Sequence, residues 1–127
     1  MPPLTQLQRN RQQRTERLRG WMLKILYEAR PDPLEFVVLS STLDEVNFGV
    51  SRSTLAIELS FLCSKKMIRV FPIGSQDELT DNEQQGLLQR CARDEETCAN
   101  VCVWLRAEGT IFVEGLAACE GIQRVRR

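Results

Sequence analysis

The chain has 127 residues, and its 17 lysines and arginines balance its 17 aspartates and glutamates. It contains no histidine, which excludes Ser-His-Asp and Cys-His nucleophiles, histidine-ligated zinc and an imidazole general base. A chain of this length buries one core without disulfide or metal staples and leaves little room for a second domain. No phosphate-binding glycine loop or hydrolase motif occurs, so we expect neither enzymatic activity nor a cofactor.

The charges are unevenly distributed along the chain. Residues 1–30 hold seven bases and two acids, a net charge of +5, whereas residues 76–99 hold two bases and seven acids, a net charge of −5. Such asymmetry indicates a nucleic-acid or acidic partner, and the alternative is a solvated surface with no partner. No apolar run reaches the roughly 18 residues that span a bilayer, so we expect no membrane association and a cytoplasmic protein.

The N-terminal region predicts a basic arm followed by a helix. Residues 1–16 form the arm, in which Gln8 to Arg17 contains no apolar side chain, so the arm is exposed whether or not it is helical. Apolar residues at helical spacing then predict a helix from Arg17 to Arg30, ended by Pro31 and Pro33.

Two short elements are predicted next. The apolar run Leu34–Leu39 predicts a strand. Thr42 and Glu45 have the spacing of a capping box, which predicts a short second helix that ends at about Asn47.

The third predicted helix has the clearest signals. Ser51 is a good N-cap, and leucines spaced four and three residues apart follow it, which predicts a helix from Arg52 to Lys65. The strand-like run Met67–Phe71 comes directly after this helix and is ended by a proline and a glycine.

The C-terminal region predicts the partner strand of a hairpin. Asn100–Arg106 alternates between two faces as a strand does. The acidic insert, residues 76–99, separates the two strands, and Leu79–Arg93 predicts a short extra helix inside it. A small helix over Thr110–Gly121 closes the domain, and residues 122–127 form a basic tail.

This order of elements predicts an α+β fold of the winged helix-turn-helix type over residues 17–121, with an enlarged wing. The segments GVSRSTLAIELSFLCSKKMIRV (Gly49–Val70) and LRAEGTIFVEGLAACEG (Leu105–Gly121) resemble small winged-helix proteins of Mu-like phages and prophages. In those proteins a GVSRD-type cap opens the third helix and an L-T-x-x-G-type element opens the last. The resemblance covers about residues 17–75 and 100–121, and implies a DNA-binding or regulatory protein of a mobile element.

The expected DNA contacts lie at the third helix, beside it and in the arm. The outer face of the third helix offers mainly serine, so we expect contacts with phosphates rather than strong recognition of bases. The arm would lie along phosphates or enter a minor groove, or would pair with the acidic insert of its own chain or of a dimer mate. The expected contact residues are Arg52, Ser53, Thr54, Lys65, Lys66, Arg69, Arg9, Arg11, Arg14, Arg17 and Arg19.

A different hypothesis is a winged-helix module that binds a protein and no DNA. Ile57 and Phe61 lie on the outer face of the third helix, where exposed apolar side chains are typical of a partner surface. The acidic insert is a second candidate surface for a protein partner, and a homodimer is a further expectation of both hypotheses.

Four of the five cysteines lie in the last third of the chain: Cys91, Cys98, Cys102 and Cys119. Converging thiolates bind zinc or iron–sulfur clusters. The intervening gaps are six, three and sixteen residues, however, and the usual C-x-x-C spacing is absent. We therefore expect these cysteines, and Cys63, to act as small buried apolar side chains rather than as a metal site.

Overall fold

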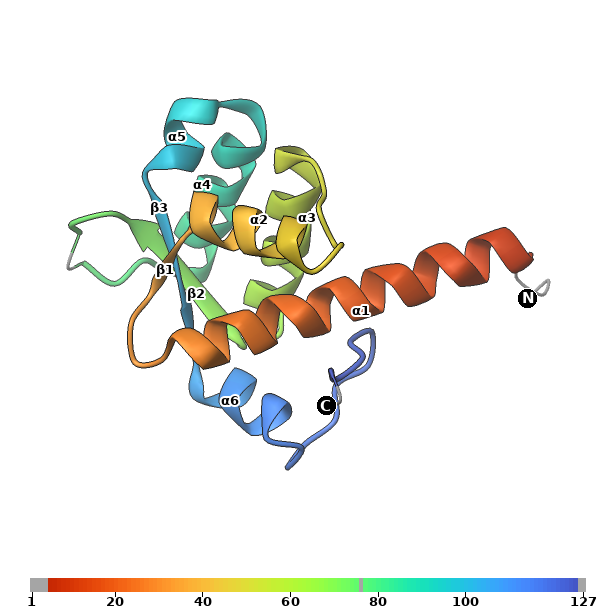
Figure 1. Cartoon of the computed structure of the whole chain (residues 1–127). Coiled ribbons are helices and arrows are strands. Elements are labelled where there is room, and N and C mark those ends of the chain that lie inside the picture. Colours follow the sequence, from red (N-terminus) through yellow and green to blue (C-terminus); the bar gives the residue numbers. More distant parts are fainter. Residues whose placement is uncertain (1–4, 76, 126–127) are drawn as a thin grey trace.

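The first helix, α1 (Gln6–Ala29), begins inside the predicted arm and continues without a break into the core. The computed structural model describes residues 5–75 and 77–125. Residues 1–4 of the arm, 76 of the insert and 126–127 of the tail lie outside the described residues. The remaining elements are, in chain order, β1 (Leu34–Glu35), α2 (Phe36–Glu45), α3 (Arg52–Ser64), β2 (Ile68–Pro72), α4 (Asp81–Arg93), α5 (Glu95–Ala99), β3 (Val101–Leu105) and α6 (Ala107–Val113) (Figure 1).

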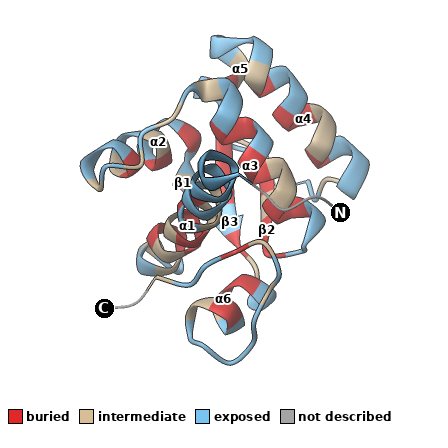
Figure 2. Cartoon of the chain, turned by 90° about the vertical axis from the view of Figure 1, so that its right-hand side faces the viewer, coloured by how far each residue is buried: buried red, intermediate tan, exposed pale blue. Residues whose placement is uncertain are grey.

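The described part of the chain forms an α+β fold, in which six helices surround one three-stranded antiparallel sheet. The strand order is β1-β3-β2, so β3 is central. Val103 of β3 pairs with Leu34 on one side and with Val70 on the other. Buried residues gather where the helices face the sheet, and exposed residues cover the outer sides of the helices (Figure 2). The predicted strand pair of the hairpin is confirmed.

The predicted strand Leu34–Leu39 is wrong beyond its first two residues. α2 begins at Phe36, and its buried side chains, Phe36, Leu39 and Leu43, recur at helical spacing. The predicted capping box is wrong as well, because Thr42 lies inside α2 and its hydroxyl donates to the carbonyl of Val38 at 2.8 Å. The N-cap of this helix is Glu35, seven residues before the N-cap that the sequence pattern indicated.

The third helix is confirmed close to its predicted bounds. The Ser51 hydroxyl accepts a hydrogen bond from the backbone N–H of Thr54 at 3.2 Å, as an N-cap does. Leu55, Leu59 and Leu62 are fully buried. The helix ends at Ser64, one residue before the predicted end.

The acidic insert contains the predicted extra helix, and this helix contributes to the hydrophobic core instead of lying on the surface of a wing. α4 packs along α3 more extensively than any other pair of described elements packs. A capping box between Thr80 and Glu83 starts α4, and Leu87, Leu88 and Cys91 lie in the core. A further short helix, α5, follows directly and was not predicted.

Gln84 connects α4 to the edge of the sheet. Its side chain is only 6% exposed, its Oε1 accepts from the backbone N–H of Val70 at 3.1 Å, and its Nε2 donates to the carbonyl of Leu79 at 3.2 Å. A buried amide that satisfies a strand N–H replaces a partner strand at this edge of the sheet.

The last predicted helix, Thr110–Gly121, is shorter and earlier than expected. α6 ends at Val113, and Gly115 with a φ of 81° lies just past that end. Leu116, which the predicted helix included, lies beyond the end of α6 and is 75% exposed. The rest of the segment returns to α1, where the N–H of Gln123 donates to the carbonyl of Glu16 at 3.0 Å.

Candidate nucleic-acid interface

The N-terminal half of α1 is a helix that packs against almost nothing. The side chain of Thr5 accepts from the N–H of Gln8, and the Gln8 side chain accepts from the N–H of Thr5, so a capping box begins the helix. Residues 5–14 are all exposed, and the first buried residue of the helix is Leu18. In Figure 1 these first turns extend beyond the other elements. The arm is therefore a defined helix presented to solvent.

The arm concentrates positive charge. Arg9, Arg11, Arg14 and Arg17 are all exposed, and no acid precedes Glu16. Arg14 contacts the body: its guanidinium lies 5.0 Å from the ring centroid of Phe48 and donates to the carbonyl of Asn47 at 3.3 Å. The other side chains are placed to meet a polyanion.

Arg124, which the sequence did not single out, is a further cation near Arg17, but its guanidinium lies next to Gly115 at the end of α6. It lines an open cavity of about 240 Å³ together with Arg17, Trp21, Gln123 and Val125. The segment returning from α6 places it there, and nothing local in the sequence indicates this proximity.

Arg19 has a different role from the other arginines predicted to contact DNA. Its Nε and Nη2 each lie 3.0 Å from Oε1 of Glu58, and Nη1 donates to the carbonyl of Gly121 at 2.9 Å. The guanidinium also covers the ring of Phe61, 3.6 Å from its centroid. These contacts hold α1, α3 and the C-terminal segment together, so Arg19 is a structural residue.

The bases beside α3 are engaged by the acidic insert. Lys66 forms an ion pair with Asp81, which lowers the pKa of that carboxyl. Arg69 lies 3.6 Å from Glu78 and packs on the ring of Trp104, 4.6 Å from its centroid. Within the described residues the insert thus pairs with bases near α3, and no ion pair joins it to the arm.

The residues of α3 that were expected to contact DNA differ in how exposed they are. Arg52 is half-buried, and its Nε is enclosed without a hydrogen-bond partner among the described residues. Ser53 and Thr54 are exposed. Lys65 at the other end of the helix is exposed, with Nζ 5.5 Å from the centroid of the Phe61 ring. The predicted contacts on α3 are therefore separated along the helix.

Ile57 and Phe61, the two apolar residues of the alternative hypothesis, differ in exposure. Ile57 is 62% exposed and borders an open cavity of about 320 Å³ between α3 and α4, together with Leu88 and Arg93. Phe61 is half-buried beneath Arg19 and Lys65. Only Ile57 is fully available as an apolar anchor.

Cys63, Cys91, Cys98 and Cys102 are buried free thiols, and Cys119 is half-exposed. No group of three or more metal-binding side chains converges within residues 5–75 and 77–125. Burial raises the pKa of Cys63 and of Cys91 to about 12, so both thiols stay protonated. The neighbouring Cys98 thiol also raises the pKa of Cys91.

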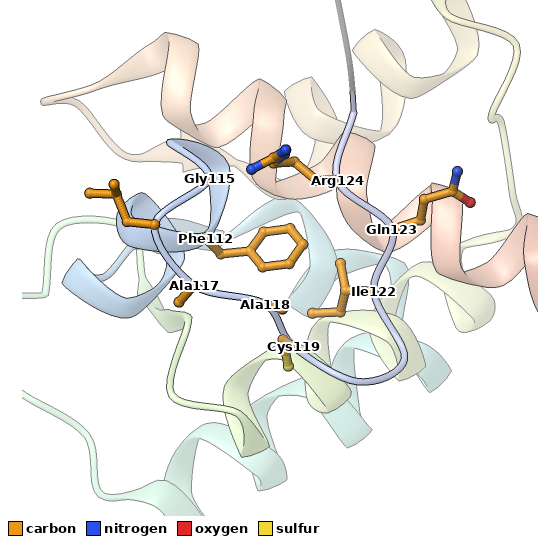
Figure 3. Close-up of a pocket in the computed structure, with 9 residues that line it drawn as sticks. Phe112, Gly115, Ala117, Ala118, Cys119, Ile122, Gln123 and Arg124 are labelled. Carbon is orange, nitrogen blue, oxygen red and sulfur yellow. The ribbon is translucent and has the colours of Figure 1, made fainter.

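A cavity of about 490 Å³ lies between α6 and the segment that follows it. Figure 3 shows Phe112 at its centre, with Ala118 and Ile122 beside it and Arg124 on the returning segment. The two buried polar side chains of the described residues, Glu58 and Gln84, both lie elsewhere. Neither of these buried polar side chains therefore lines the cavity.

None of the helices in the described part of the chain combines the length and apolar character that a bilayer crossing needs. Comparison with known proteins finds no matching family model, no matching curated protein and no matching solved structure. The function must accordingly be inferred from the geometry of the chain itself.

Proposed function

We propose that this protein is a small DNA-binding protein of the regulatory or accessory kind, which holds DNA mainly through phosphates. The observation that carries the proposal is the exposed half of α1, a capped helix with three arginines and no acid before Glu16 and with the exposed Arg17 directly after it. The helix order and the β1-β3-β2 sheet support the finer assignment of a winged-helix fold with α4 and α5 in place of the wing tip. A phage or prophage origin rests on the sequence resemblance alone.

The proposed contact surface differs from the one expected from the sequence. Arg9, Arg11 and Arg17 carry most of the interaction, with Arg14 and Lys65 at its edges. The acids of the insert offset the charge of Lys66 and Arg69, so these two contribute little to phosphate binding.

The test is the salt dependence of binding to a random-sequence DNA duplex, measured by fluorescence anisotropy at about 50 and about 200 mM salt. Each phosphate contact contributes about 0.9 to the log–log slope, so the double variant R9A/R17A should lower the slope by about 2. The matched control is R90A/R93A, which removes two exposed arginines from α4. Absence of salt-sensitive binding, or an equal loss in both variants, contradicts the proposal.

The exposed Ile57 supports a second candidate function, the binding of a protein through the α3–α4 cavity. The simplest partner is a second copy of the chain. In that case I57D should convert a dimer into a monomer in sedimentation experiments, whereas V37D, at a site that is 46% exposed on α2, should not. A monomeric native protein contradicts self-association through Ile57.

A further inference from the structure

Three amide side chains of the arm lie on one strip of α1. Gln6, Asn10 and Gln13 are spaced four and three residues apart, which places them on the same side of a helix, and Arg17 extends the strip toward the body. All four are exposed, and Gln6 Nε2 donates to Asn10 Oδ1 at 3.1 Å. At about 100° per residue, Arg9 and Arg14 flank the strip on its two sides.

The shape of the arm selects one groove of a nucleic acid. An α-helix is about 10–12 Å wide, which fits the roughly 12 Å major groove of B-form DNA but not its minor groove of about 6 Å. The major groove of A-form RNA is too narrow for such a helix. Because the arm is a capped helix rather than an extended chain, contact in the minor groove is excluded for the arm as folded here.

The chemistry of the strip suits adenine. Asn and Gln form paired hydrogen bonds with N6 and N7 of adenine in the major groove. Arg9 flanks the strip on one side and is placed to contact a phosphate backbone, whereas Arg14 on the other side donates to the carbonyl of Asn47 and packs on Phe48. α3 lacks side chains of this kind. Its exposed residues include Ser53, Thr54 and Ile57, and the described part of α3 holds no Asn or Gln. α4 packs along another side of α3.

We propose that the N-terminal half of α1 enters the major groove of duplex DNA and recognises adenine-containing sequence through Gln6, Asn10 and Gln13. This inference rests on the proposed DNA binding and adds sequence recognition to it. The strip from Gln6 to Arg17 is about 16 Å long, which corresponds to about 5 base pairs.

The experiment selects binding sites from a random duplex library with the full chain and then compares affinities for an enriched and a scrambled site. Asn10→Ala and Gln13→Ala should each lower the ratio of these affinities by about tenfold and leave the salt slope unchanged. Gln12→Ala is the matched control, because Gln12 lies on roughly the opposite side of the helix and is also exposed.

A helix-breaking variant separates a folded arm from a flexible one. Gln12→Pro disrupts the arm helix, and the core is unaffected because residues 5–14 are exposed. It should keep salt-dependent binding but bring the affinity ratio close to one, with Gln12→Ala again as its control.

Three results overturn the inference: no enriched site, an unchanged ratio in Asn10→Ala and Gln13→Ala, or tighter binding to a structured RNA than to duplex DNA. If R9A/R17A still lowers the salt slope in the first two cases, DNA binding stands and only base recognition falls. If the native chain binds no DNA at any salt concentration, both proposals fall together.

Discussion

Arg19 and Glu58 face each other across the α1–α3 interface, and two guanidinium nitrogens lie 3.0 Å from the same carboxylate oxygen. Their side chains are 17% and 8% exposed. A carboxylate this enclosed depends on its partner, because removing one member of a buried pair leaves the other charged and poorly solvated. The pair therefore orients the basic helix relative to α3.

Arg19→Ala should lower the free energy of unfolding by about 3 kcal/mol, since it leaves Glu58 without its main partner. Chemical denaturation measures this cost. Arg17→Ala, an exposed neighbour on the same helix, should change stability by less than about 0.5 kcal/mol. The double variant R19M/E58M should recover most of the loss, and a failure to do so would show that packing on Phe61 rather than charge pairing dominates.

Gly20→Ala should loosen the C-terminal segment. A Cβ at this position would lie 1.8 Å from the carbonyl oxygen of Gln123, so that segment must move away from α1. We expect a destabilisation of about 1–3 kcal/mol and faster hydrogen exchange of the Gln123 amide. Gly86→Ala, where nothing lies within 4 Å of the new Cβ, should instead stabilise α4 by about 0.5–1 kcal/mol. Equal effects of the two substitutions would contradict this packing.

Acid should weaken the start of α4. Hydrogen bonds with Thr80 hold the pKa of Glu83 below its ordinary value of 4.5, and the Lys66 ammonium lowers the pKa of Asp81. Stability gained in this way is present above the ordinary pKa and is lost as the pH falls through the lowered one. Glu83→Gln keeps a capping side chain but does not titrate, so its stability deficit relative to the native chain should shrink below about pH 4.5 in thermal melts.

Thr80→Ala removes the N-cap itself and should cost about 1 kcal/mol at neutral pH. The companion substitution Ser51→Ala, at the N-cap of α3, should cost a similar amount. If Thr80→Ala were neutral, α4 would not contribute to the cooperative core that its buried side chains imply.

Thiol labelling should modify one cysteine per chain quickly. Cys119 is half-exposed, whereas the other four are buried. With a pKa of about 12, only about one Cys63 or Cys91 side chain in ten thousand is a thiolate at about pH 8. Mass spectrometry after brief alkylation checks this, and rapid labelling of all five in the native state would contradict the buried positions.

The elements that the sequence predicted well have local signals. α3 follows a serine N-cap and carries a leucine pattern, and β3 alternates, with Val101, Val103 and Leu105 buried. α2 was misassigned because Val37 and Val38 favour strands by their branched side chains, although both are exposed on the helix. The buried residues of this segment recur at helical spacing, so burying them against the core outweighed the preference of the two valines for a strand.

The site was harder to predict because charge in a sequence does not show its partners. Arg19 and Glu58 are 39 positions apart, and Lys66 meets Asp81 only because α4 folds back along α3. Gln84 is a polar residue that any pattern would place outside, yet it completes the edge of β2. The arginines of the arm were predictable as exposed cations because the stretch from Gln8 to Arg17 has no apolar side chain that could bury that helix.

The position of α4 and α5 between β2 and β3 has a consequence for how the chain folds. Pro72 pairs with Val101 and Ile68 pairs with Leu105, so the paired residues are separated by 29 to 37 positions rather than by a tight turn. Closing so long a loop is entropically costly before its contacts form, whereas α3 and α4 are near neighbours in sequence. We expect the α3–α4 pair to assemble first and the central strand to join last, so that substitutions on β3 speed unfolding more than they slow folding.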